Sequence, residues 1–257
     1  MINIGKFKNR LNEKSYNNFG SEIVISRYNG CYDVDIYFPE YNWTAKNREY
    51  NNFKRGNVKC PYERTVFNIG YIGEIGEKIN IKKEKSYEIW HNIMQRCYDK
   101  KYKDKHPAYK NCKVCEEWLN YTNFYKWYNS HYYEIPGYKR RMAIDKDILI
   151  KGNNLYSPDT CIFVPEDINI IFAKNSSMRG KYPIGVSYDK KNDKYNVTIR
   201  KYGKQYNLGR YDTIEESFQI YKYNKENYIK EVANLYKKWI PSKLYDAMCN
   251  YEVEMED

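Results

Sequence analysis

The stretch that most constrains the fold of this chain is residues 142–173, where two short β-type runs precede a helical run. Gly152-Asn153-Asn154 is a turn sequence, and it separates an expected strand over 145–150 from a second one over 161–164. Pro165 fits the first position of a helix, where its missing N–H breaks no hydrogen bond. The stretch therefore predicts a ββα unit, which is either a metal-binding hairpin or a stable hairpin packed on a helix.

Tyrosine supplies much of the apolar surface, since 31 Tyr stand against 9 Phe and 5 Trp. A chain of 257 residues with this composition is expected to bury several modest cores rather than a single large one. We expect a modular α+β fold with a flexible arm, a β-rich module, a helical and ββα core, a three-stranded sheet with a helix, and an acidic tail. The expected boundaries are 1–20, 21–73, 85–173, 174–240 and 241–257, with a charged linker over 74–84.

The β-rich module is predicted from alternation of apolar and polar residues in SEIVISRY and CYDVDIYF. Asn29-Gly30 between them is a hairpin turn sequence. Later in the module, Lys54 and Arg55 belong to a group of basic residues. That group is either a DNA-contacting surface or an ordinary solvated face.

The remaining segments alternate between helical and strand patterns. Aromatic residues at helical spacing predict helices over 85–135. Thr213 followed by Glu216 is a capping box that favours the start of a long amphipathic helix over 213–238. The last seven residues, YEVEMED, are acidic and expected to be disordered. Three strands are expected before the long helix, over 185–188, 195–200 and 206–211.

The formal net charge is +11, and the basic residues are interleaved with tyrosine and asparagine. Lys and Arg neutralise phosphates while aromatic and amide side chains approach bases, so nucleic acid is the leading class of partner. The alternatives are a charge that serves only solubility and attraction to an acidic membrane surface. No run reaches the roughly 18 to 20 apolar residues that span a bilayer. The N-terminus lacks an apolar signal core, so a cytoplasmic protein without a membrane partner is expected.

Two sets of residues resemble known families. The first resembles the phage HNH endonucleases, which are homing-endonuclease-like proteins found free-standing in phage genomes, and the second resembles an AP2 DNA-binding domain. Together these resemblances cover roughly residues 85–238. The first set is Trp90, Met94, Arg96-Cys97-Tyr98, Val114-Cys115, Trp118, Asp145-Lys146, Tyr156-Ser157-Pro158, Cys161, Val164-Pro165 and Asn169. The second set is Gly185-Val186, Tyr195, Val197, Ile199-Arg200, Leu208-Gly209, Tyr211, Thr213 and Glu215-Glu216.

The first resemblance implies an HNH-like site in which Asp145 on the first strand and Asn169 on the helix hold Mg²⁺ or Mn²⁺. Asn154, near the turn, would orient the strand or the phosphate. Lys146 stands where the family has its general-base histidine, and a protonated lysine is a poor base. Lys146 is therefore expected to stabilise charge on the phosphate. Asp147 or a metal-bound water would then supply the base.

Four cysteines raise the question of structural Zn²⁺. Cys112 and Cys115 have the spacing of a zinc knuckle, and the family pattern would bring Cys97 and Cys161 to them. A single Cys-x-x-Cys pair is a weak zinc signal, however, and a free Cys is a common small buried residue. Disulfides are not expected in a reducing compartment. Zinc ligation and inert buried thiols therefore both stay open.

The second resemblance implies an AP2-like sheet whose alternate side chains face the major groove of DNA. Residues 174–210 carry ten Lys or Arg and two Asp, which favours DNA over a merely solvated face. Plant members of the family have arginines on the first strand, where this chain has Ser187 and Asp189, so a different base sequence is expected to be read. The candidates for base contacts are Tyr188, Tyr195, Thr198, Arg200 and Arg210. The candidates for phosphate contacts are Arg179, Lys181, Lys190, Lys194, Lys201 and Lys204.

These features predict a phage-type endonuclease that binds duplex DNA through basic modules and nicks or cuts it with one divalent ion. It would work in the cytoplasm of the host cell if a phage encodes it. The alternative is a catalytically inactive DNA-binding protein. Such a protein would be a regulator, or a counter-defence factor that occupies DNA or a host protein. RNA binding is a third hypothesis.

Overall fold

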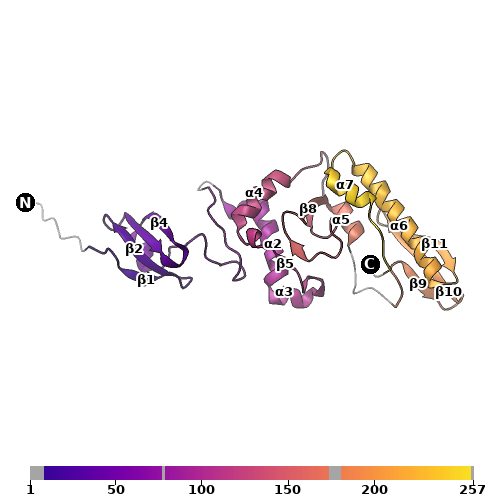
Figure 1. The fold of residues 1–257 in the computed structure, drawn as a ribbon, viewed down its shortest axis with the longest axis horizontal. Helices are drawn as coiled ribbons and strands as arrows, with labels where there is room; N and C mark the ends of the chain where they lie inside the picture. The colour runs from indigo at the N-terminus through magenta and orange to yellow at the C-terminus, as the bar shows by residue number, and fades with distance from the viewer. Residues whose placement is uncertain (1–8, 77–78, 174–180, 256–257) are drawn as a thin grey trace, which may run out of the picture. The chain divides into compact units, whose positions relative to one another are not determined.

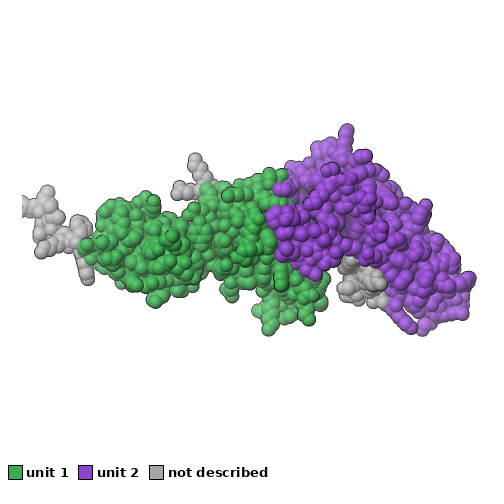
Figure 2. Space-filling view, in the orientation of Figure 1, with its two compact units in different colours: residues 1–130 green, residues 131–257 purple. Residues whose placement is uncertain are grey.

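The computed structural model describes residues 9–76, 79–173 and 181–255, which contain both helices and strands (Figure 1). The α+β expectation is confirmed at this level. The chain divides into two compact units, residues 1–130 and residues 131–257 (Figure 2). None of the helices in the described ranges has the length and apolar character needed to cross a membrane.

The first unit begins with a four-stranded antiparallel sheet in the order β1-β2-β3-β4. Ile23 and Ile25 are fully buried in its core together with Phe53 of helix α1 (Tyr50–Lys54). The expectation of a flexible arm over 1–20 is wrong for residues 14–16, which form β1 and pair with β2. Residues 1–8 lie outside the described ranges. The strands are β1 (Lys14–Tyr16), β2 (Glu22–Tyr28), β3 (Val34–Phe38) and β4 (Trp43–Arg48).

Helices make up most of the rest of the first unit, as the aromatic spacing predicts. Trp90 and Trp118 are fully buried, and the Trp90 indole Nε1 donates a hydrogen bond to the Trp118 carbonyl at 2.7 Å. The helices are α2 (Lys85–Tyr98), α3 (Lys100–Lys105) and α4 (Tyr121–His131), with the short strand β5 (Lys113–Val114). Short 3-10 helices are η1 (Pro39–Tyr41), η2 (Ile81–Lys83), η3 (Pro107–Tyr109) and η4 (Glu116–Leu119).

A ββα arrangement is present in the second unit. Strand β6 (Met142–Asp145) pairs antiparallel with β8 (Ile162–Pro165), and helix α5 (Glu166–Phe172) follows. The expected first strand, 145–150, is misplaced because β6 ends at Asp145 instead of beginning there. The short strand β7 (Leu155–Tyr156) lies in the loop between β6 and β8.

A three-stranded antiparallel sheet in the order β11-β10-β9 follows, and the three strands predicted from sequence are all found. The long helix α6 (Ile214–Tyr236) begins after Thr213, whose Oγ1 accepts a hydrogen bond from the Glu216 backbone N–H at 3.1 Å. The predicted capping position is thus confirmed. The strands are β9 (Val186–Asp189), β10 (Lys194–Lys201) and β11 (Lys204–Tyr211).

Helix α6 contributes to two separate cores, one shared with the sheet and one shared with the hairpin. Its N-terminal half packs Phe218 and Tyr221 with residues such as Val197 of β10. Its C-terminal half packs Tyr228, Ile229, Val232 and Ala233 with Ile148, Ile162, Val164 and Ile168 of the hairpin and α5. The sheet and the hairpin are therefore joined through one continuous helix.

The acidic C-terminal segment is folded onto this unit, so the disorder expected for YEVEMED is wrong for its residues 251–255. Helix α7 (Ser242–Cys249) packs on the hairpin core, and Val253 is buried against the sheet core. The Val253 backbone N–H donates to Glu226 Oε1 and its carbonyl accepts from Lys222 Nζ, both at 2.9 Å. Lys151 of the hairpin loop forms an ion pair with Glu254 at 2.9 Å.

Candidate metal hairpin and nucleic-acid interface

Asp145 ends strand β6 with its carboxylate fixed by the chain that follows. Its Oδ1 accepts hydrogen bonds from the backbone N–H groups of Asp147 at 2.8 Å and Ile148 at 2.7 Å. Aspartate favours this turn because its short side chain reaches the amides that follow it. The side chain predicted to hold a metal ion is therefore fixed at the end of a strand.

A second carboxylate, that of Asp147, interacts with Asp145 in the same loop. Burial raises the pKa of Asp145 to about 6 with help from the Asp147 charge, although the backbone N–H donors act in the opposite direction. Two neighbouring carboxylates repel each other unless a proton or a cation lies near them. The pair therefore concentrates negative charge and oxygen atoms at the end of β6.

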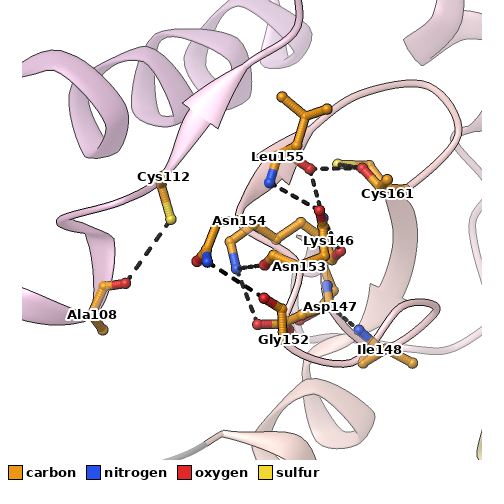
Figure 3. Close-up of polar contacts among 12 residues, drawn as sticks. Ala108, Cys112, Lys146, Asp147, Ile148, Gly152, Asn153, Asn154, Leu155 and Cys161 are labelled. Carbon is orange, nitrogen blue, oxygen red and sulfur yellow. Dashed lines mark hydrogen bonds and ion pairs between the residues drawn. The ribbon is translucent and has the colours of Figure 1, made fainter.

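Lys146, at the position where the resembling family has a histidine, is tied into this loop (Figure 3). Its Nζ donates to the Asn153 carbonyl at 2.8 Å and pairs with the Asp147 carboxylate at 3.0 Å. Asn153 Nδ2 donates in turn to the carbonyls of Lys146 and Leu155, both at 2.7 Å. An ammonium in an ion pair lacks the lone pair that a general base needs. Its contacts favour charge stabilisation and loop support over proton abstraction.

The two predicted amide residues, Asn154 and Asn169, lie on different parts of the unit. Asn154 is exposed in the turn, with its Nδ2 at 3.4 Å from the Gly152 carbonyl oxygen (Figure 3). Asn169 is half-buried within α5, which starts at the end of the hairpin opposite Asp145. No hydrogen bond joins Asn169 to Asp145 within the described residues, so their joint role in holding an ion stays a prediction.

The oxygen donors at the end of β6 fit a hard divalent ion by their chemistry. Within residues 9–76, 79–173 and 181–255, no group of three or more His, Cys, Asp or Glu side chains is arranged to hold a metal ion. Mg²⁺ does not require such a group, because it commonly binds one or two carboxylates and keeps several waters. Lys146 competes with such an ion for the Asp147 carboxylate.

The four candidate zinc ligands lie in surroundings that favour uncharged thiols. Cys97 and Cys112 are buried, and the Cys112 Sγ lies 4.0 Å from the Ala108 carbonyl oxygen (Figure 3). Burial raises the pKa of Cys115, and it raises the pKa of Cys161 to about 12. Since zinc binds the thiolate form, these surroundings favour the neutral thiol in the absence of the ion. Zinc ligation stays a prediction.

The register of the three-stranded sheet separates its side chains onto two faces. Val197 and Ile199 of β10 are buried on the face that packs with α6. Because side chains alternate along a strand, the neighbouring positions lie on the opposite face. We call this the open face; it carries Ser187 and Asp189 from β9, Lys194, Asn196, Thr198 and Arg200 from β10, and Gln205, Asn207 and Arg210 from β11.

Polar contacts orient the cations of the open face. The Arg210 Nε lies 2.9 Å from Asp189 Oδ2, and the Arg200 Nε donates to the Gly203 carbonyl at 3.1 Å. The Arg210 side chain is nevertheless half exposed. The Asn196 Oδ1 is buried with no hydrogen-bond partner in the described structure. The amide residues of this face were missed from the sequence, although alternation counted from Val197 could have found them.

Tyr188 and Tyr195, which were predicted to contact bases, alternate with the open-face residues. Tyr195 pairs with Tyr188, their ring centroids are 5.3 Å apart, and Tyr195 lies on the same face as Val197. Their placement favours a supporting role for the strands. Contact of these two tyrosines with DNA stays a prediction.

The other predicted phosphate contacts are spread over several segments. Lys190 is exposed in the turn between β9 and β10, and Lys204 is exposed at the start of β11. Lys201 lies with its Nζ 5.6 Å from the centroid of the Tyr228 ring. Lys181, Lys54 and Arg55 are exposed, and Arg179 lies outside the described residues.

Comparison of the chain with models of known protein families, with curated proteins and with solved structures finds no match. The candidate sites therefore depend on their own geometry and chemistry.

Proposed function

We propose that this protein is a DNA endonuclease. It binds duplex DNA through the open face of the β9–β11 sheet and hydrolyses a phosphodiester at the β6–β8 hairpin with one divalent ion. The observation that carries the proposal is the open face, a partly exposed row of arginine, lysine, amide and hydroxyl side chains, with the Asp189 carboxylate among them, on the side of the sheet opposite the Val197 and Ile199 core.

Side chains of these types recognise DNA in two ways. Arginine can donate two hydrogen bonds to guanine, and asparagine or glutamine can make two with adenine. Lysines around the sheet neutralise phosphates and give affinity that falls with salt. Arg210, Arg200, Gln205 and Asn207 are candidates for base contacts, and Lys190, Lys194 and Lys204 are candidates for phosphate contacts.

At the hairpin, Asp145 would hold the ion, with Asn169 from α5 as the second ligand that the family resemblance implies. A bound Mg²⁺ or Mn²⁺ supplies charge stabilisation for the scissile phosphate. Asp145 is fixed for this task by two backbone N–H groups. Lys146 adds a positive charge in the loop, and Asp147 is the carboxylate that could accept a proton from water.

Incubation of supercoiled plasmid with the full chain and Mg²⁺ or Mn²⁺ tests the proposal. Nicked or linear plasmid is expected, and EDTA should prevent its formation. Intact plasmid at every protein and metal concentration would contradict the nuclease part of the proposal.

The second candidate function is a DNA-binding protein without nuclease activity. The ion pair between Lys146 and Asp147 favours it, because an ammonium lies where a general base would be expected. Under this alternative, plasmid is retarded in a gel but stays intact, and the binding constant falls steeply with salt concentration.

A further inference from the structure

The second unit contains a pocket that shares only Arg200 with the proposed DNA-binding face. Its volume is about 740 Å³, within the range of small-molecule sites. It is lined by residues of α5, α6, the β10–β11 hairpin and the C-terminal segment 251–253, together with Arg140 and Ile184. Its charged lining residues are Arg140, Asp167, Arg200 and Lys225. All of these lining elements belong to the second unit.

A half-buried cation, Lys225 of α6, lines this pocket. Its Nζ donates one hydrogen bond, at 2.8 Å, to the Ile171 carbonyl in the last turn of α5. Burial lowers the pKa of Lys225 to about 8, and no charged neighbour contributes to that shift. Among the described residues, no carboxylate lies within ion-pair distance of the Lys225 ammonium. Partial removal of a charge from water without a counter-ion is unfavourable, so an anion from outside the chain would stabilise the Lys225 ammonium.

Aromatic and apolar side chains form much of the remaining wall. Tyr221, Tyr228 and Tyr251 line the pocket and offer ring surfaces. Ile170 and Leu235 also line it and are 54% and 62% exposed, so they add apolar surface that is open to solvent. The pocket thus combines an apolar, aromatic wall with the half-buried Lys225 ammonium, while the Asp167 carboxylate of the same wall is already paired with Arg140.

We propose that this pocket binds a small organic anion, in which a flat ring is attached to a carboxylate or a phosphate. The anionic group pairs with the Lys225 ammonium, and the ring lies against the tyrosines and the exposed Ile170 and Leu235. Such a ligand supplies both the missing counter-charge and the missing apolar cover.

A purely structural role for Lys225 accounts for less of the geometry. An ammonium at the end of α5 satisfies a helix carbonyl, and positive charge is favourable at that end of a helix. That role uses one of its three N–H groups and needs no pocket beside it.

Matched sets of probes test the proposal on the full chain by calorimetry and by thermal unfolding. Indole-3-acetate and adenosine 5′-monophosphate carry both ring and anion. Indole and adenosine carry the ring alone, and acetate and inorganic phosphate carry the anion alone. At least one of the two ring-bearing anions is expected to bind and to raise Tm. It should bind more tightly than the matching ring alone or the matching anion alone. A response to indole-3-acetate would indicate a carboxylate ligand, and a response to adenosine 5′-monophosphate would indicate a phosphate ligand.

The variant Lys225→Met should weaken that binding about 10- to 100-fold, as expected for the loss of a charged hydrogen bond. It should fold well, because methionine occupies a similar volume and carries no charge that has to leave water. Lys230→Met, at an exposed position of the same helix, is the matched control and should bind like the original chain. The proposal fails if neither ring-bearing anion binds, or if Lys225→Met binds it unchanged.

One further variant separates failure of the pocket proposal from failure of the DNA proposal. Arg210→Ala alters the open face and does not touch the pocket lining, so it should leave ring-anion binding unchanged. An equal loss of ring-anion binding in Arg210→Ala would place the binding on the sheet and overturn the pocket assignment.

Discussion

The hairpin and the sheet are both packed on helix α6, yet they use their polar side chains in opposite ways. In the hairpin, Asp145, Lys146 and Asn153 are engaged with the backbone of their own loop. On the open face of the sheet, Gln205 and Asn207 are exposed and Arg210 is half exposed. The hairpin is organised internally, whereas the sheet presents its polar groups outward.

This difference separates two tasks of the proposed enzyme. A surface that reads DNA needs side chains free to reach base edges and phosphates. A site that performs chemistry needs side chains held in a fixed position. Substitutions in the two regions should therefore change different measurements.

The largest effect is expected from Asp145→Ala, which should lower the rate of plasmid cleavage about 10³-fold because it removes the proposed metal ligand. DNA affinity, measured by gel retardation, should change little. The matched control is Asp159→Ala, an exposed carboxylate in the same loop. Equal cleavage by Asp145→Ala and the original chain would remove the hairpin from the mechanism.

Gly185→Ala should disrupt the sheet and thereby lower the free energy of unfolding in urea by about 3 kcal/mol. Gly185 has a φ of +78°, and a Cβ there would meet the Tyr221 ring of α6. Gly203 has the same φ, but a Cβ there would meet nothing within 4 Å. Gly203→Ala should therefore cost only about 1 kcal/mol of backbone strain. Equal losses in the two variants would mean that contact with α6 does not fix the start of β9.

Arg210→Ala should weaken binding to the preferred duplex by about 1 to 3 kcal/mol if the side chain reads a base. The loss should be largest on that sequence and small on unrelated DNA. Lys230→Ala on α6 is the control, because it removes one positive charge away from the open face. Titrations of fluorescent duplexes at several salt concentrations measure the effect, and identical losses for both variants would speak against the open face.

The smallest effect is a pH dependence in the hairpin. The folded-state pKa of Asp145, about 6, lies above its ordinary value of 3.8, so the folded protein holds a proton that the unfolded chain releases. Stability should therefore fall as pH rises from about 4 to about 6, by about 1 to 2 kcal/mol from this residue. Asp145→Asn should remove that part of the slope in urea unfolding. Parallel profiles for the two proteins would mean that burial does not perturb this carboxyl.

Local sequence rules predicted elements whose signals lie within the element. The capping pair at Thr213 and the alternation around Val197 led to α6 and to the three strands. The ββα order followed from the turn at Gly152 and from Pro165. The boundary of the first strand was missed, because the apolar run Ile148-Leu149-Ile150 resembles a strand. The Asp145 side chain instead ends the strand and directs Ile148 into the core with α6.

Features that depend on distant partners could not be predicted from local sequence. The acidic tail looked disordered by composition, but Val253 is buried and its backbone bonds to Lys222 and Glu226 of α6. The pocket around Lys225 likewise arises from segments far apart in the chain. No local pattern marks a lysine whose counter-charge is missing.

The proposed function requires that the sheet and the hairpin, joined by α6, act on one DNA molecule. Mapping on end-labelled duplexes can locate both the footprint of the bound protein and the positions of the metal-dependent cuts. Cuts are expected at a constant distance from the footprint on every bound sequence. Cuts with no fixed relation to the footprint, or a footprint without cuts, would contradict this requirement.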